Sequence, residues 1–165
     1  MEPFLITNTD VVIRLILAML LGCLVGSERL FAGKTASMRT YSLVSLGSTV
    51  YVVVSLLVTN QYIQITSFDP LRMASQVVVG VGFLGAGLIV FKDSKLNGLT
   101  TAAGLWLSAA VGVAVGYGLF ELAIMASFLT LFIFVVLGFL KKKLQKMPSL
   151  HFPDEHRTTD EDDEI

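Results

Sequence analysis

Charged and strongly polar side chains are scarce in this sequence, and those that could do chemistry stand near the ends of long apolar runs. Charges inside a membrane are costly and usually face the bundle interior or a water-filled cavity, so these residues could line an ion path or bind a partner. The alternative is structural: the side chains snorkel to the membrane surfaces and stabilise helix ends, which their positions within about two turns of an interface favour. The candidate polar residues are Arg14, Glu28, Arg39, Asp69, Arg72 and Gln76.

The spacing of these charges limits how they can pair. Arg14 and Glu28 would lie about 21 Å apart along one helix, so they cannot pair with each other. Arg14 lies one turn from Asp10 and could face Asp69, whereas Glu28 is next to Arg29. Because a buried charge without a partner is costly, we expect Arg14 and Asp69 to act as one unit at one end of the bundle.

No group of residues in the sequence forms a catalytic constellation. Both histidines, His151 and His156, lie in the polar tail, and no pair of carboxylates falls inside an apolar run. The acidic run at residues 160–164 is typical of a solvated tail. We therefore expect no catalytic residue, no metal ligand set, no cofactor and no enzymatic activity. The net charge of −1 indicates no nucleic-acid partner.

Small residues recur inside the apolar runs. Residues 80–85 match G-x-G-x-x-G, but a dinucleotide site requires a preceding strand, and this motif lies within an apolar run. Small residues instead let membrane helices approach closely. We expect the first, third and fourth helices to form the packed centre and the fifth to face lipid. The residues assigned to helix packing are Gly22, Gly26, Gly80, Gly82, Gly85, Gly87, Gly104, Ser108 and Gly112.

The apolar runs themselves predict the elements that position these residues. Apolar residues make up 54% of the 165 and charged residues 15%, where a soluble domain carries about 25% charged residues. The sequence predicts an all-α polytopic membrane protein with about five transmembrane helices, because each run can hold the roughly 20 apolar residues that span a bilayer core. The expected helices are residues 11–27, 41–58, 70–91, 99–117 and 119–140.

Residues 1–140 would form this transmembrane domain, and residues 141–165, basic and then acidic, a disordered tail. Most Lys and Arg residues fall in the loops and tail of one side. The positive-inside rule then places the N-terminus outside and the C-terminus in the cytoplasm.

Four blocks of sequence are familiar: RLILAMLLGCLVGSER at residues 14–29, MRTYSLVSLGS at 38–48, DPLRMASQVVVGVGFLGAGLI at 69–89 and GLTTAAGLWLSAAVGVAVGYG at 98–118. Together, and in this order, they resemble the MgtC/SapB family of bacterial inner-membrane proteins. The resemblance spans about residues 14–140. The matching positions are Arg14, Gly22, Gly26, Glu28, Arg29, Arg39, Thr40, Asp69, Pro70, Arg72, Gly80, Gly82, Gly85, Gly87, Thr100, Thr101 and Trp106.

The resemblance implies a membrane domain of about five helices in proteins linked to growth in low magnesium, acid survival or persistence inside host cells. The family is often labelled a magnesium transporter, whereas its best-known members look more like regulators of other membrane machines. The chain departs from the family pattern before Arg39, where Ala36-Ser37-Met38 stands for the usual Ala-Gly-Leu. Many members also carry a folded cytoplasmic domain after the last helix, so regulation through such a domain is not carried over.

Together these features predict an MgtC/SapB-type inner-membrane protein linked to magnesium or ion homeostasis, acting as a non-enzymatic regulator that packs against another membrane complex. The alternative is a cation transporter or channel for Mg²⁺, for which Glu28 and Asp69, at opposite ends, are the only family-matching carboxylates. A homodimer would bring two copies of each together. The lipid bilayer is the expected surrounding, and another membrane complex, a second copy and Mg²⁺ are the candidate partners.

Overall fold

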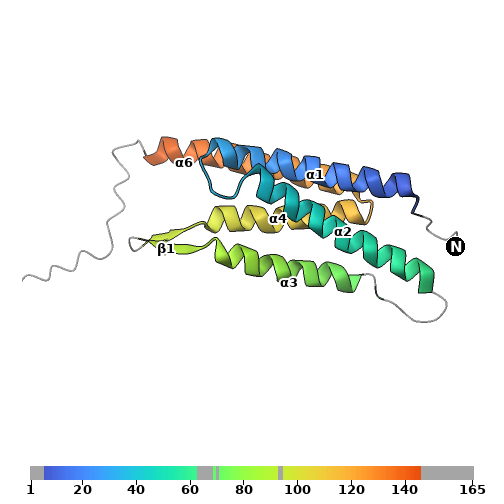
Figure 1. Ribbon diagram of the computed structural model, residues 1–165. Coiled ribbons are helices and arrows are strands. Elements are labelled where there is room, and N and C mark those ends of the chain that lie inside the picture. The colour runs from blue at the N-terminus through green and yellow to red at the C-terminus, as the bar shows by residue number, and fades with distance from the viewer. Residues whose placement is uncertain (1–5, 63–68, 70, 93–94, 146–165) are drawn as a thin grey trace, which may run out of the picture.

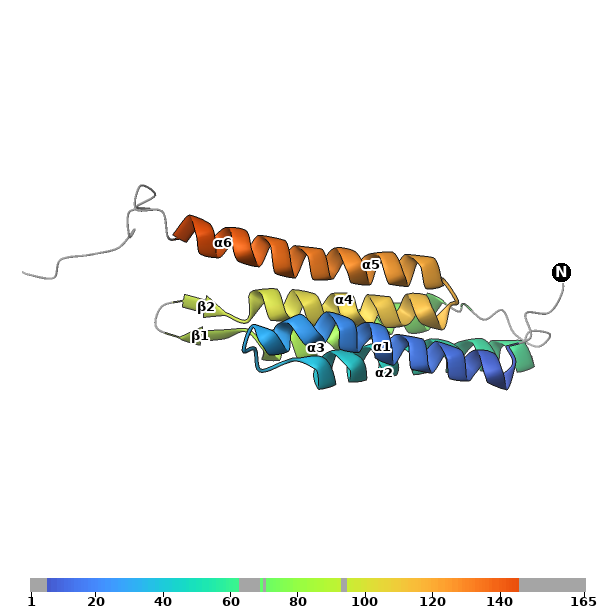
Figure 2. The ribbon, with the colours of Figure 1, turned by 90° about the horizontal axis from the view of Figure 1, so that it is seen from above.

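The computed structural model describes residues 6–62, 69, 71–92 and 95–145 as a bundle of antiparallel helices with one small hairpin (Figure 1). The elements are α1 (Asn8–Phe31), α2 (Met38–Tyr62), α3 (Leu71–Gly87), β1 (Val90–Lys92), β2 (Lys95–Asn97), α4 (Leu99–Gly116), α5 (Phe120–Phe132), the π-helical turn η1 (Ile133–Leu137) and α6 (Gly138–Gln145). Figure 2 shows that α5, η1 and α6 form one continuous rod. The predicted all-α class is confirmed.

The lengths of the helices separate α3 from the others. Four segments are long and apolar enough to cross a membrane: Asn8–Phe31, Met38–Asn60, Leu99–Gly116 and Phe120–Leu140. The fifth, α3, is apolar but has only 17 residues. The described chain is therefore a multi-pass membrane protein with four long apolar helices and one shorter apolar helix, where the sequence predicted about five transmembrane helices.

The first helix begins earlier than predicted because its start is capped by side chains. Thr7 and Asp10 form a capping box, in which the amide of Asp10 donates to Thr7 Oγ1 at 3.2 Å and the amide of Thr7 donates to Asp10 Oδ2 at 3.0 Å. These bonds satisfy backbone donors that a helix start leaves free. The helix then runs for 24 residues instead of the 17 expected at residues 11–27.

The third helix ends earlier than predicted, and a hairpin follows it. Residues 70–91 were expected to be helical, but α3 ends at Gly87, and β1 pairs with β2 in antiparallel register, with Phe91 opposite Leu96. A short apolar run is compatible with either a helix or a strand, so its periodicity could not distinguish them. Gly98 has φ +94° and lies against the carbonyl of Leu88, which closes the base of the hairpin.

The centre of the bundle is formed by α1, α2 and α4, not by the predicted first, third and fourth helices. The helix α4 contacts α1, α2, α3 and α5, and α1 packs most extensively against α2. By contrast α3 lies at the edge, where only Val81 and Gly85 are buried. The polar groups of α2 explain the difference, because Ser45, Ser48 and Thr49 are buried small residues that allow close approach as glycine does.

Backbones meet closely at the contacts of α2 with α1 and α4. A Cβ atom at Gly22 would lie 2.7 Å from the carbonyl oxygen of Tyr41, and one at Gly26 would lie 2.7 Å from Cα of Met38. A Cβ atom at Gly112 would overlap the carbonyl group of Ser45. Such contacts leave no room for any side chain at these glycines.

Hydrogen bonds join α2 and α4 along the same contact. Thr49 Oγ1 donates to the carbonyl oxygen of Gly112 at 2.7 Å, and Ser108 Oγ donates to that of Tyr41 at 2.9 Å. Tyr41 Oη donates to the carbonyl oxygen of Thr101 at 2.9 Å. Polar bonds between membrane helices stabilise their association, so these three bonds fix the register of α2 against α4.

The glycines of α3 have different surroundings. A Cβ atom at Gly85 would lie 3.7 Å from Cβ of Ala102, an ordinary contact with α4. Within the described residues, no atom lies within 4 Å of a Cβ built at Gly80, Gly82 or Gly87. Their assignment to helix packing stays a prediction, and any helix they contact must lie outside the part of the chain described.

We expect Gly112→Ala to lower the free energy of unfolding by at least about 1–3 kcal/mol, the usual cost of overpacking, because the added methyl group displaces the backbone of α2. Gly80→Ala is the matched control and should leave stability unchanged or slightly raised, since alanine favours helix and meets no neighbour there. Thermal unfolding of the purified protein in detergent micelles measures both. Equal stability of the two variants would contradict the close approach of α2 and α4.

Candidate functional site

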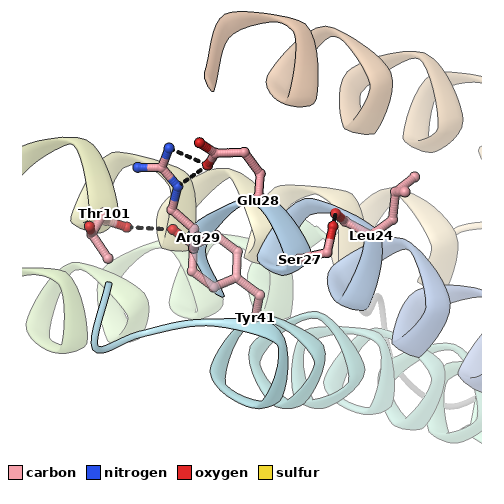
Figure 3. A network of polar contacts seen from close by, with 6 residues as sticks. All are labelled: Leu24, Ser27, Glu28, Arg29, Tyr41 and Thr101. Carbon is pink, nitrogen blue, oxygen red and sulfur yellow. Dashed lines mark hydrogen bonds and ion pairs between the residues drawn. The ribbon is translucent and has the colours of Figure 1, made fainter. Parts of the chain in front are cut away.

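A buried ion pair lies at the end of the bundle that carries the hairpin, here called the hairpin end. Arg29, in the last turn of α1, is 5% exposed, and its Nε and Nη2 contact the same oxygen, Oε2, of Glu28 (Figure 3). A cation here is favoured by the partial negative charge at the carboxyl end of α1. Arg29 thus neutralises the charge of Glu28 and also stabilises the carboxyl end of α1.

The ring of Phe134 packs against the guanidinium group of Arg29. The Arg29 Cζ atom lies 3.8 Å from the centroid of the Phe134 ring, a cation–π contact. Phe134 belongs to the π-helical turn η1, and it is the buried residue of that turn. Single π-helical turns occur frequently at functional sites, where they turn one side chain inward. The turn here places an aromatic ring under a buried charge.

The residues around this pair belong to one apolar cluster. Val25, Ala36, Tyr41, Leu105 and Phe134 pack together, so the helices α1, α2 and α4, the turn before α2 and the π-helical turn η1 meet there. The hydroxyl of Tyr41 bonds to the carbonyl oxygen of Thr101 in the first turn of α4 (Figure 3). The start of α4 is thereby tied to α2, beside the ion pair.

A cavity of about 1270 Å³ opens beside the ion pair. Its walls come from the end of α1, the turn after it, the hairpin, the start of α4 and the rod of α5, η1 and α6. Many of its apolar lining residues come from the rod and the hairpin. The polar residues that line it are Ser27, Glu28, Arg29, Lys34, Thr35, Asn97, Thr100 and Thr101.

Arg14 is buried at the opposite end of the bundle. It is 5% exposed, and its Nη1 donates to the carbonyl oxygen of Gly116 at 2.5 Å. Gly116 is the last residue of α4, and a Cβ atom at Gly118 in the following turn would lie 3.2 Å from Arg14 Nη2. Arg14 therefore caps the carboxyl end of α4 with a positive charge, as helix ends favour.

Asp69 lies at the same end but has its own partner. Its Oδ1 accepts a hydrogen bond from the amide of Leu71 at 2.9 Å, which caps the start of α3. Burial raises the pKa of Tyr117, and the negative charge of Asp69 adds to this increase. Asp69 is therefore close to the turn that Arg14 contacts. The predicted coupling of Arg14 and Asp69 stays a prediction.

The other predicted polar residues lie on the surface. Arg39 is exposed in the first turn of α2, and Arg72 and Gln76 are exposed on α3. The sequence placed Arg72 and Gln76 on a face directed inward, but α3 sits at the edge of the bundle and turns them outward. Gln76 instead lines a groove of about 590 Å³ between α2 and α3. In the described chain, no three His, Cys, Asp or Glu side chains come together as metal ligands.

Sequence reasoning missed Arg29 as a site residue, together with Phe134. The sequence identified Arg29 as a neighbour of Glu28 and as a position that matches the family, but not as a site residue, although it is the more deeply buried of the two. Its position in the block at residues 14–29 was the available signal. Nothing in the run of large apolar residues around Phe134 indicates a π-helical turn, so that contact could not be foreseen.

Comparison with known proteins gives a consistent family assignment. The profile of the MgtC family matches residues 15–143. The chain is 40% identical over 131 residues to "Putative magnesium transporter YhiD" of Escherichia coli (strain K12), a match that covers 78% of this chain and 61% of that protein. It is 38% identical over 138 residues to "Protein MgtC" of Salmonella typhimurium (strain LT2), which covers 83% and 56%.

A third relative is "Protein MgtC" of Brucella abortus (strain 2308), which is 44% identical over 128 residues, covering 78% of this chain and 50% of that protein. The chain thus spans about half to three fifths of the length of the curated relatives it matches. No solved structure matches the chain.

We expect Arg14→Met to lower the free energy of unfolding by about 1.5–3 kcal/mol, the contribution of a hydrogen bond to a charged group, because it leaves the end of α4 without its cap. Arg72→Met, at an exposed position, should change stability by less than about 0.5 kcal/mol. A double-mutant cycle that combines Arg14→Met with Asp69→Asn then measures the predicted coupling free energy between Arg14 and Asp69. Coupling below about 0.5 kcal/mol would show two independent residues.

Removing only one member of the buried ion pair should be more harmful than removing both. Glu28→Gln leaves the guanidinium of Arg29 buried without its counter-charge, so we expect a loss of about 3–5 kcal/mol. Changing Arg29 to Met as well should restore most of that loss, because no unpaired charge then remains. Thermal unfolding of the three variants is the measurement, and simple additivity of the two changes would rule out a mutually dependent pair.

Proposed function

The chain belongs to the MgtC family of membrane proteins, and from that premise we propose that it is a non-enzymatic regulator linked to magnesium or ion homeostasis. It acts by packing against another complex of the bacterial inner membrane. Regulation of this kind requires a surface that a partner helix can approach. It does not require an ion path through the bundle. Both points find support in the arrangement of the helices.

The observation that carries the proposal is the outer face of α3. Val79 is 69% exposed and Phe83 is 82% exposed, and the glycines at positions 80, 82 and 87 have open space around them. Glycine gains nothing from contact with lipid and weakens a helix by about 1 kcal/mol relative to alanine. Small residues in membrane helices are useful where another backbone approaches. The partner of this face is a helix of another membrane protein or of a second copy of the chain.

The interior of the bundle supports the same proposal. The charged residues most deeply buried in the described chain are Arg14 and Arg29, and both are cations. At the contact of α2 and α4, the hydroxyl groups of Thr49 and Ser108 are bonded to helix carbonyls. A path for Mg²⁺ would need oxygen ligands and retained waters, which a tightly packed interface with cationic ends does not offer.

The orientation follows from the distribution of basic residues. Lys34, Arg39, Lys95 and Lys143 lie at the hairpin end, where loops and the end of α6 meet. Basic residues concentrate on the cytoplasmic side of membrane proteins. The hairpin end therefore faces the cytoplasm, and the start of α1 with Arg14 faces outward. The predicted tail lies mostly in residues 146–165, outside the described residues.

Cation transport is the second candidate, because one relative carries the name of a magnesium transporter. Glu28 and Asp69 would be its carboxylates, but they lie at opposite ends of the bundle, and Glu28 is engaged by Arg29. A transport path would require rearrangement of that pair. We therefore favour regulation over transport.

On this proposal the protein supports growth of the bacterium in low magnesium, and we expect Gly82→Leu to abolish that support, because the larger side chain keeps the partner helix away from α3. Val136→Phe is the control, since Val136 is exposed on the rod of α5, η1 and α6 and does not line the cavity at the hairpin end. Both variants should fold, as thermal unfolding checks. Growth in low magnesium and site-specific cross-linking from position 79 measure the loss of function and of the complex.

Two outcomes would contradict the proposal. If the Gly82→Leu variant grows as well as its control variant, the α3 face has no role in the function. Mg²⁺ flux into liposomes that contain only the purified chain, lost in Glu28→Gln, would establish the transport alternative instead.

A further inference from the structure

The cavity at the hairpin end combines features that the proposed regulatory role does not use. Most of its polar lining residues come from the end of α1, the turn after it and the start of α4, and most of its apolar lining residues come from the rod and the hairpin. Pockets for small molecules usually measure about 300–1,000 Å³, so this one, at about 1270 Å³, can hold a head group together with part of an acyl chain. We propose that it binds the phosphate group of an anionic amphiphile, with a membrane phospholipid as its source.

The charges of the lining favour an anion. They are two cations, Arg29 and Lys34, and one anion, Glu28, which leaves one net positive charge. Glu28 is already engaged through one carboxylate oxygen, while the second terminal nitrogen of Arg29 points away from it (Figure 3). Lys34 is exposed at the edge of the cavity, where its ammonium group can follow a ligand. In the proposed site, the buried side chain of Arg29 supplies a charge in a fixed position, and the exposed side chain of Lys34 supplies a charge that can move to the ligand.

The start of α4 adds donors to the same wall. Gly98, the residue before the helix, has no side chain to cap it, and Thr100 and Thr101 in the first turn line the cavity. A helix start that no side chain caps presents free amide groups and a partial positive charge to an anion. Here this feature strengthens a cavity that already contains a buried arginine, and Asn97 at the end of the hairpin lines the same cavity.

The apolar part of the wall selects an amphiphile over a small soluble anion. Leu131, Ile133 and Val135 come from a segment that crosses the membrane, and Val90 and Leu96 come from the exposed hairpin. A free phosphate would leave these side chains uncovered, whereas the first carbons of an acyl chain would cover them. Basic pockets between membrane helices are known sites for anionic lipid head groups.

Native mass spectrometry of the full-length chain tests the proposal directly. The probes are phosphatidylglycerol, phosphatidylcholine with the same acyl chains, and inorganic phosphate. We expect the protein to retain phosphatidylglycerol in preference to phosphatidylcholine. Lys34→Gln should weaken this binding about fivefold, the effect of one basic residue near an anionic membrane surface.

Lys95→Gln is the matched control, because Lys95 is an exposed lysine at the same end of the bundle but does not line the cavity. It should leave the binding of phosphatidylglycerol unchanged. If both lysine variants weaken it equally, the attraction is diffuse and the proposal is overturned. The proposal is also overturned if the two lipids are retained equally. If inorganic phosphate displaces the lipid, the cavity is still a phosphate site, but its ligand is a soluble phosphate compound and not a phospholipid.

Thr100→Trp gives a second, steric test that changes no charge. Thr100 is exposed on the cavity wall, so the indole ring can fill the space without disturbing the core. We expect thermal stability without added lipid to be kept and the stabilisation by phosphatidylglycerol to be lost. Retained stabilisation by the lipid would show that it binds elsewhere. The test does not involve the α3 face, so it is independent of the outcome of the docking experiment.

Discussion

Helix association inside a bilayer receives little help from the hydrophobic effect, because lipid tails are as apolar as the side chains they would release. Close backbone contact and hydrogen bonding must supply the stability instead. In this chain both are concentrated on α2, whose backbone touches Gly22 and Gly26 on α1 and Gly112 on α4. The hydroxyl groups of Thr49 and Ser108 bond across the same contact. The positions of the charged groups at both ends follow from this packing.

Much of the architecture could be predicted from the sequence, because long uncharged runs admit few structures other than membrane helices. The helix start at Asp69 was also predictable from the chemistry of capping. The central place of α2 was not predicted, since its small residues are hydroxylated rather than glycines, and only hydrogen bonds to the carbonyls of Ser45 and Gly112 make the hydroxyl of Thr49 suitable for burial there. The hairpin was missed because Val90 and Phe91 continue an apolar run.

The candidate site was less accessible to sequence reasoning than the fold. The charged positions were identified, but their partners depend on which helices are neighbours. Arg14 bonds to a carbonyl group at the end of α4, and a backbone group leaves no trace in the sequence. Arg29 depends on Phe134, which is more than a hundred residues away and is directed inward by the local winding of η1. Such contacts are properties of the assembled bundle.

The short length of α3 has a mechanical consequence for the surrounding bilayer. A helix of 17 residues is about 26 Å long, whereas the 24 residues of α1 extend for about 36 Å. A hydrophobic segment shorter than the hydrocarbon thickness is accommodated by local thinning of the bilayer, at a cost that grows with the mismatch. The hydrocarbon core is about 30 Å thick, so either the apolar residues Val90 and Phe91 that follow α3 or a local thinning of the bilayer must cover the difference. Where the bilayer thins beside α3, a neighbour with a similarly short helix would share the deformation, and bilayer thickness would then favour its association with α3.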